Sequence, residues 1–141
     1  MPDDIKRNNS VQRAEPISPA VLVIEDDPAL LHSLAVLFEA YGVHFVTARD
    51  GREGLEIFRR ISPAVVLTDI IMPEQDGIGV IMEMRRERPG VKIIAMSGSG
   101  RCGKSDFLTV AKKLGADSVI HKPFDIDELV ETINQHLKQG S

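Results

Sequence analysis

Acidic side chains and one lysine stand at the ends of short apolar runs, where their chemistry can be combined. Glu25 and Asp26 follow one run, Asp69 ends a second, and Lys122 follows a third, while Ser97 ends a fourth. If these runs are parallel strands, their carboxyl ends meet at the edge where open α/β sheets bind ligands. Clustered carboxylates favour a bound cation, and carboxylates, a divalent metal and a lysine together suit a phosphoryl group. The residue types therefore predict a phosphate-handling site at one edge of a sheet.

Composition predicts a single globular domain. The chain has 141 residues, of which 43% are hydrophobic, and its net charge of −4 gives no general attraction to nucleic acid or anionic lipid. No apolar run approaches the roughly 18 residues that a membrane span needs. The acidic N-terminus lacks the apolar stretch of a signal peptide, and the one cysteine, Cys102, has no internal partner. We expect a cytoplasmic protein that binds neither nucleic acid nor membrane.

Helical and strand patterns alternate along the chain after residue 20. Residues 1–19 are polar and aperiodic, so we predict a disordered tail before a domain at residues 20–139. Strands are expected at 21–25, 43–48, 63–69, 91–97 and 117–121, and helices at 28–40, 50–60, 78–88, 105–114 and 125–139. Five successive β-α units predict an α/β fold with a doubly wound parallel five-stranded sheet.

Charged residues away from the strand ends look structural. Arg85, Arg86 and Arg88 alternate with Glu83 and Glu87, which predicts a solvated helix face rather than a nucleic-acid patch. The histidines have no metal-binding spacing and are expected at the surface or partly buried: His32, His44, His121 and His136.

These residues, in this order and spacing, resemble the receiver domain of bacterial two-component response regulators, in its stand-alone form. The resemblance covers about residues 20–138. It is carried by the acidic pair Glu25-Asp26, by Asp69 in the run Asp-Ile-Ile-Met-Pro-Glu-Gln-Asp-Gly, by Ser97, and by Lys122-Pro123-Phe124. The implied strand order is the flavodoxin-like 2-1-3-4-5, which places the first and third strands side by side.

The resemblance also implies a metal and a phosphoacceptor. Asp69 would accept the phosphoryl group and become an aspartyl phosphate. Mg²⁺ would be bound by Asp26, by Asp69 and by the backbone carbonyl of Ile71, with Glu25 acting through water. The chain would therefore be a phosphoacceptor with partly self-catalysed chemistry, and not an enzyme in the usual sense.

The phosphoryl oxygens would be held from the other strands. By resemblance, Lys122 pairs with one oxygen, Ser97 donates its hydroxyl to another, and Gly98 offers a backbone N–H. Pro123 is the candidate for a cis peptide that aims the lysine. Val119 stands where receivers often carry an aromatic switch residue, so the output mechanism is expected to differ from that pattern.

The implied partners are proteins. The donor would be a phosphohistidine on a histidine kinase or a phosphotransfer protein, or else a small acyl phosphate. Phosphorylation would change the surface around the fourth helix, the fifth strand and the fifth helix, which an unknown downstream protein would read. The sequence leaves open whether the chain forms a homodimer.

Two alternatives stay open from the sequence. Gly98–Ser105 satisfies the P-loop pattern G-x-x-x-x-G-K-S of nucleotide-binding proteins. That interpretation leaves Glu25, Asp26 and Lys122 unexplained, and only 36 residues follow Ser105. The other alternative is a degenerate receiver that binds a partner without phosphorylation, which the absence of an aromatic at the switch position supports and the complete set of site residues opposes.

Overall fold

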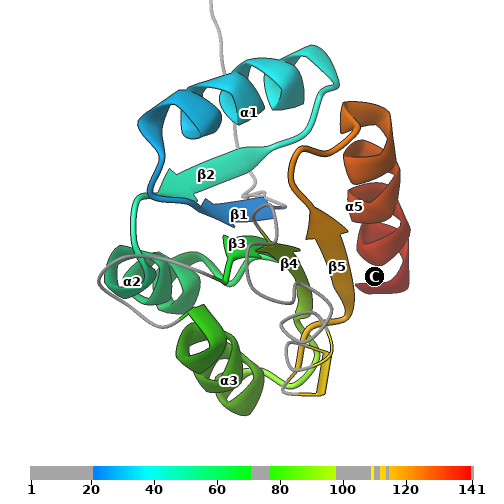
Figure 1. Cartoon of the computed structure of the whole chain (residues 1–141). Coiled ribbons are helices and arrows are strands. Elements are labelled where there is room, and N and C mark those ends of the chain that lie inside the picture. The colour runs from blue at the N-terminus through cyan, green and yellow to red at the C-terminus, as the bar shows by residue number, and fades with distance from the viewer. Residues whose placement is uncertain (1–20, 71–76, 98–108, 110–111, 114, 141) are drawn as a thin grey trace, which may run out of the picture.

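The computed structural model describes residues 21–70, 77–97, 109, 112–113 and 115–140. Strands alternate with helices from residue 21 to residue 97, and one more strand and one more helix lie within residues 118–140 (Figure 1). The strands are β1 (Val21–Ile24), β2 (Phe45–Ala48), β3 (Val65–Asp69), β4 (Lys92–Ser97) and β5 (Ser118–His121). The helices are α1 (Pro28–Ala40), α2 (Gly51–Ile61), α3 (Gly77–Glu87) and α5 (Ile126–Gly140).

The strands form one parallel sheet in the order β2-β1-β3-β4-β5. The predicted α/β class and the strand order 2-1-3-4-5 are therefore confirmed. Ile24 pairs with Thr68 across β1 and β3, and Asp69 pairs with Met96 across β3 and β4. This register brings the residues that end β1 and β3 to the same level of the sheet.

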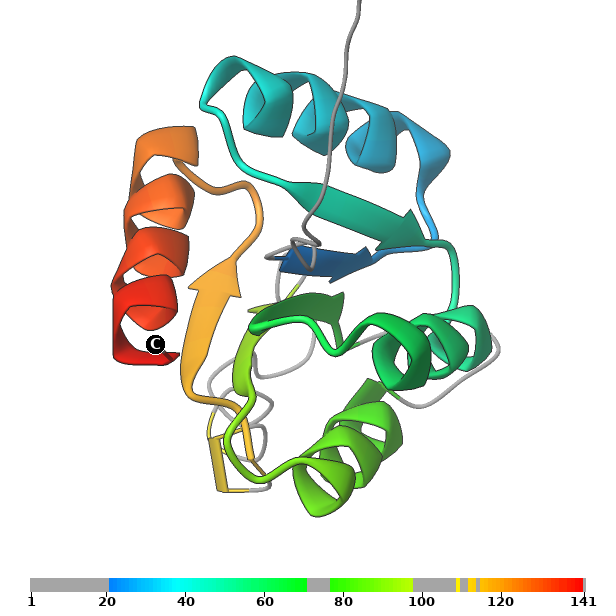
Figure 2. The ribbon, with the colours of Figure 1, turned by 180° about the vertical axis from the view of Figure 1, so that it is seen from behind.

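Helices cover both faces of the sheet, α1 and α5 on one and α2 and α3 on the other (Figures 1 and 2). Side chains alternate between these two faces along each strand. In β1, Val21 and Val23 pack with α1 and α5, whereas Leu22 and Ile24 pack with α2 and α3. All four are fully buried, as expected for a strand covered on both sides.

Local signals explain where the elements begin and end. The Asp27 side chain accepts a hydrogen bond from the Ala29 N–H and caps α1, and Asp50 caps α2 in the same way. The second strand starts two residues later than predicted. Gly42, at φ +73°, lets the Val43 N–H turn back to the Phe38 carbonyl, so residue 43 closes the helix. Most of the predicted helix at 105–114, and the tail at 1–19, lie outside the described residues.

The prediction that all three arginines near the end of α3 belong to a solvated face was wrong. The Arg88 guanidinium lies 4.0 Å from the centre of the Phe58 ring and donates to the Phe58 carbonyl, which caps α2. Arg85 is half-buried and bonded to the segment before β5. His136 is buried, with only 9% of its surface exposed, and its Nε2 lies 2.7 Å from the Ser118 hydroxyl.

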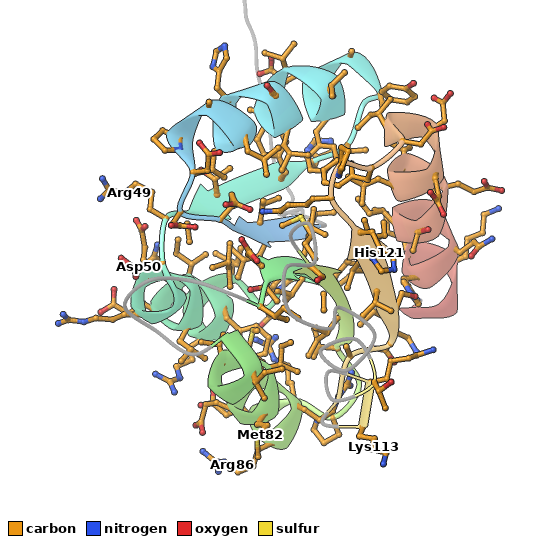
Figure 3. The ribbon with its side chains drawn as sticks, viewed as in Figure 1. Arg49, Asp50, Met82, Arg86, Lys113 and His121 are labelled. Carbon is orange, nitrogen blue, oxygen red and sulfur yellow. The ribbon has the colours of Figure 1, made fainter. Side chains whose placement is uncertain are left out.

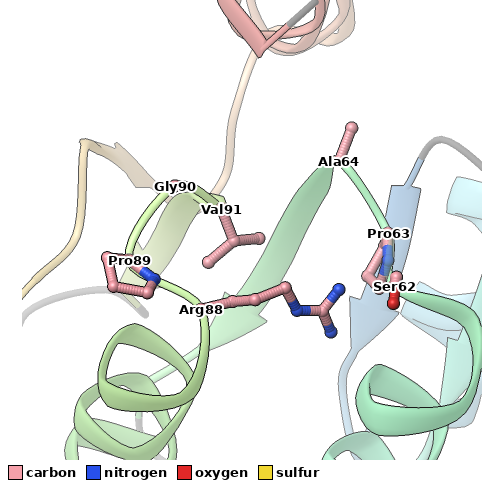
Figure 4. A pocket seen from close by; sticks show the side chains of 7 residues that line it. All are labelled: Ser62, Pro63, Ala64, Arg88, Pro89, Gly90 and Val91. Atoms are coloured by element: carbon pink, nitrogen blue, oxygen red, sulfur yellow. The ribbon is translucent and has the colours of Figure 1, made fainter.

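Ser62 follows α2 in a left-handed conformation, at φ 52° and ψ 62°. It lines a cavity of about 260 Å³ at the amino edge of the sheet together with Arg88 (Figure 4). We expect Ser62→Gly to raise the free energy of unfolding by about 1 kcal/mol, because glycine removes a left-handed penalty of about 1–2 kcal/mol and its greater unfolded-state entropy offsets part of the gain. Urea unfolding measures the change. Ser62→Ala keeps the Cβ atom and should show no gain, so an equal gain in both variants would contradict the explanation.

Candidate functional site

Three carboxylates meet where β1 and β3 end. Glu25 and Asp26 directly follow β1, and Asp69 is the last residue of β3. Because these strands are neighbours in register, one carboxylate oxygen from each residue lies within 4.8 Å of the other two. The sheet therefore brings together the three acids that the strand ends predicted.

Lys122 reaches these carboxylates from the loop after β5. Its Nζ donates to Glu25 Oε1 at 2.8 Å and to Asp69 Oδ2 at 2.9 Å. The Lys122 N–H donates to the Ser97 carbonyl at 2.8 Å, which continues the β4–β5 pairing up to the lysine, and the Lys122–Pro123 peptide is cis. Glu25 is 1% exposed and Asp69 5%, so both ion pairs are largely shielded from water.

Burial dominates the electrostatics of this cluster. Loss of hydration raises the pKa of Glu25 above its ordinary value, and the charge of Asp69 adds to this although the Lys122 hydrogen bond opposes it. Burial alone would lower the pKa of Lys122, but its hydrogen bonds to Glu25 and Asp69 outweigh that cost and leave the pKa raised. The lysine is therefore a firmly held ammonium in the middle of an acidic cluster.

The donor set fits a hard divalent cation. Three carboxylates against one ammonium leave a formal excess of negative charge. Glu25 uses both oxygens, one on Lys122 and one on the Asp27 N–H. Asp26 is the most exposed of the three acids, and its carboxylate has no hydrogen-bond or ion-pair partner among the described residues. Carboxylate oxygens with room for water are the ligands that Mg²⁺ prefers.

The remaining predicted residues divide into described and undescribed ones. Ser97 is 1% exposed at the end of β4, at the same edge of the sheet as Asp69. Val119 is partly buried against the cluster under α2 and α3. Ile71, Gly98 and the P-loop pattern at Gly98–Ser105 lie outside the described residues.

Two residues that contact the backbone of Asp69 were missed from the sequence. The Thr68 hydroxyl donates to the Asp69 carbonyl at 3.1 Å and is fully buried. Gly77, the first residue of α3, lies so close to β3 that a Cβ atom there would be 2.6 Å from the Asp69 carbonyl oxygen. In the sequence, Asp76-Gly77 indicates only a turn into a helix, and no sequence signal shows what the start of that helix contacts.

The response regulator receiver domain matches residues 21–134. The chain belongs to this family. Receivers are phosphoacceptor signalling modules of two-component systems, they bind Mg²⁺ at an acidic pocket, and they interact with histidine kinases. The cluster of Glu25, Asp26 and Asp69 is this receiver's acidic pocket.

Curated relatives of this receiver include larger transcriptional regulators. The transcriptional regulatory protein GlrR of Escherichia coli (strain K12) is 31% identical over 121 residues, covering 86% of this chain and 27% of GlrR. The probable transcriptional regulator ycf27 of Porphyridium aerugineum is 36% identical over 121 residues, and the match covers 84% of this chain and 48% of the ycf27 chain. The receiver thus spans about a quarter to a half of the length of these relatives.

Solved receiver domains share the fold over most of this chain. The receiver domain protein from Clostridium thermocellum is 31% identical with a TM-score of 0.78, covering 84% of this chain and 94% of its own. The CheY-like receiver from Methanospirillum hungatei JF-1 is 28% identical with a TM-score of 0.77, covering 85% and 94%. Within the described ranges, no helix of this receiver is long and apolar enough to cross a membrane.

Proposed function

We propose that this receiver accepts a phosphoryl group on Asp69 with Mg²⁺ bound, and that the phosphorylated form signals to a protein partner. The donor is a phosphohistidine on a histidine kinase or a phosphotransfer protein. One observation carries the proposal: the Lys122 ammonium lies 2.8 Å from Glu25 and 2.9 Å from Asp69, beside the carboxylate of Asp26. An ammonium in this position can stabilise the negative charge of the aspartate and, after transfer, the negative charge of the phosphoryl group.

Each residue has a defined part in the transfer. An Asp69 carboxylate oxygen forms the new bond to phosphorus while the phosphorus–nitrogen bond of the donor breaks, and the imidazole leaves with the electron pair. Bound Mg²⁺ supplies neutralisation of charge on the phosphoryl oxygens. Asp26, Asp69 and the Ile71 carbonyl hold the metal in this proposal, and Glu25 acts through water because both of its oxygens are already engaged.

In this proposal, residues at the ends of β4 and β5 bind the phosphoryl oxygens on the side away from the metal. We assign Lys122 and the Ser97 hydroxyl to phosphoryl oxygens, with the Gly98 N–H beside them. Signalling then passes to the surface of β5 and α5 without an aromatic side chain at position 119. Val119 already packs against the core under α2 and α3, which supports an output that depends on other residues.

Phosphorylation of Asp69 can be tested by intact mass after incubation with Mg²⁺ and acetyl phosphate. We expect one added phosphoryl group on the parent and on Asp50→Asn, and none on Asp69→Asn. Asp50 is a matched control, since it caps α2 and asparagine caps helices equally well. Borohydride reduction followed by peptide mapping should convert the acyl phosphate at residue 69 to homoserine.

Other outcomes would redirect the assignment. An adduct that persists in Asp69→Asn would place the acceptor elsewhere. No adduct together with no Mg²⁺ binding would favour the degenerate receiver that acts as an interaction module. ATP binding in a fluorescence titration would revive the P-loop alternative.

A further inference from the structure

The Arg85 guanidinium donates hydrogen bonds to the backbone after α3 and to the segment that leads into β5. Its Nε donates to the Gly115 carbonyl at 3.2 Å, and its Nη2 donates to the same carbonyl at 2.6 Å. Nη1 donates to the carbonyls of Pro89 and Val91, both at 2.6 Å. The second Nη2 bond goes to Asp117 Oδ2 at 2.6 Å. A guanidinium has five N–H donors, and all five are accounted for here.

Asp117 continues this arrangement into the sheet. Its N–H donates to the Ile93 carbonyl at 2.7 Å, and its Oδ2 accepts the Ile93 N–H at 2.8 Å while also binding Arg85. Gly115 has φ +137°, and a Cβ atom there would press on the Arg85 side chain at 3.3 Å. We call Arg85, Gly115, Asp117 and Ile93 the Arg85 latch. The latch fixes where the chain enters β5 relative to β4.

β5 depends on such a fixed point because it is an edge strand. Within the part of the chain that the structure describes, β5 pairs only with β4, over four residue pairs from Ile94–Ser118 to Ser97–His121. On the other face, the Ser118 hydroxyl contacts His136 of α5 at 2.7 Å. Lys122 follows directly after this short strand. At roughly 3.3 Å per residue, the five steps from Asp117 to Lys122 span about 16 Å.

The acidic pocket is therefore built from two parts that different strands carry. Glu25, Asp26 and Asp69 lie at the ends of β1 and β3, the central strands, which bond to neighbours on both sides. Lys122 lies at the end of an edge strand whose start is clamped by the Arg85 latch. A shift of β5 along β4 would move the lysine but leave the carboxylates in place.

We propose that Arg85 and Asp117 are positioning residues that set the place of Lys122 in the acidic pocket from the opposite edge of the sheet. The inference rests on the proposed role of Lys122 in phosphorylation. Its particular consequence is a split between two properties of the site. Loss of the latch impairs the step that needs the lysine, whereas metal binding by the central carboxylates persists.

Arg85→Met tests the proposal, with Arg86→Met as its matched control. Methionine keeps the apolar stem of the arginine and removes the guanidinium. Arg86 lies on the same helix, with a 70% exposed side chain that pairs with Glu83 and points away from the sheet (Figure 3). Three quantities are measured in each variant: the rate of phosphorylation by acetyl phosphate, the Mg²⁺ affinity, and the rate of reductive methylation of Lys122 in metal-free protein, read by peptide mass spectrometry.

In Arg85→Met we expect phosphorylation to slow by about 10- to 100-fold, the size of effect that a misplacement of about 1 Å can cause. Lys122 should be methylated several-fold faster because it spends less time between the carboxylates. Mg²⁺ affinity should stay equal or become tighter. Arg86→Met should match the parent in all three. Asp117→Asn keeps an oxygen that can accept the Ile93 N–H, so it should fall between the parent and Asp117→Ala.

Unchanged methylation of Lys122 in Arg85→Met would overturn the proposal, and so would a fall in Mg²⁺ affinity parallel to the fall in rate, which indicates general loosening. If Arg85→Met does not fold, the same comparison between Asp117→Asn and Asp117→Ala decides. A parent protein that takes up no phosphate from acetyl phosphate and binds no Mg²⁺ would refute the proposed function. The methylation rates would still accept or reject the latch in that case, since they need neither metal nor phosphate.

Discussion

Lys122→Met is expected to abolish detectable phosphorylation of Asp69 and at the same time to tighten Mg²⁺ binding. The ammonium lies within 3 Å of two carboxylates, at 2.8 and 2.9 Å, and repels a second cation in the same cluster. Two unit charges about 5 Å apart interact by about 3 kcal/mol at an effective dielectric constant of about 20, and solvent reduces this, so we expect roughly tenfold tighter binding. Loss of one aimed group at a transferring centre costs about 100- to 1000-fold in rate.

The same variant should be less stable without metal. Glu25, 1% exposed, would lose its counter-ion, and removal of one partner from a buried pair costs about 3–5 kcal/mol. We expect the free energy of unfolding to fall by about 2–3 kcal/mol at neutral pH. This is less than for a fully buried pair because the Lys122 side chain is 20% exposed. The pKa of Glu25 is already raised by burial, so protonation relieves the unpaired charge early as the pH falls. The deficit relative to the parent should therefore shrink in mild acid.

Urea unfolding at neutral and mildly acidic pH, together with a Mg²⁺ titration, checks both halves of this prediction. Lys113→Met is the control, since its exposed side chain lies at the periphery of the molecule (Figure 3) and away from the acids. Weaker Mg²⁺ binding in Lys122→Met, or a stability deficit that grows in acid, would contradict the prediction. Either result would show that the Lys122 ammonium does not neutralise the negative charge of the carboxylates.

The fold was predictable because its signals are local. Apolar runs of strand length and helix-capping acids such as Asp27 and Asp50 mark each element within a few residues of its place. The acids of the site were predictable for a related reason. Parallel strands bring their carboxyl ends to one edge, so Glu25 and Asp69 had to meet once β1 and β3 were neighbours. Strand order itself came from the family resemblance, because alternating β and α patterns permit other orders.

Contacts between distant segments could not be predicted. Arg85 bonds to Gly115, 30 residues further along, and charge alternation along a helix cannot show which arginine faces a neighbouring loop. His136 meets Ser118 across a helix–strand interface in the same way. The periodicity of a sequence shows which residues share one face of a helix. It does not show which other segment that face packs against, so the Arg85 latch could be found only in the folded structure.

Gly77→Ala is expected to destabilise the protein by about 2–3 kcal/mol and to impair phosphorylation, although alanine favours helices over glycine by about 1 kcal/mol. A Cβ atom at position 77 would lie 2.5 Å from the Ile70 Cα and 2.6 Å from the Asp69 carbonyl oxygen. Both are backbone atoms, which cannot rotate out of the way as a side chain can. Relief of the clash must therefore move α3 away from β3 or displace the backbone of Asp69.

Gly90→Ala separates this clash from the general effect of replacing glycine. A Cβ atom at position 90 would meet nothing within 4 Å, so we expect that variant to match the parent in urea unfolding and in phosphorylation by acetyl phosphate. If the acceptor is displaced as proposed, Gly77→Ala should also bind Mg²⁺ more weakly, in contrast to Lys122→Met. Gly77→Ala with parental stability and rate would mean that α3 can withdraw freely, and that its first turn does not hold Asp69 in place.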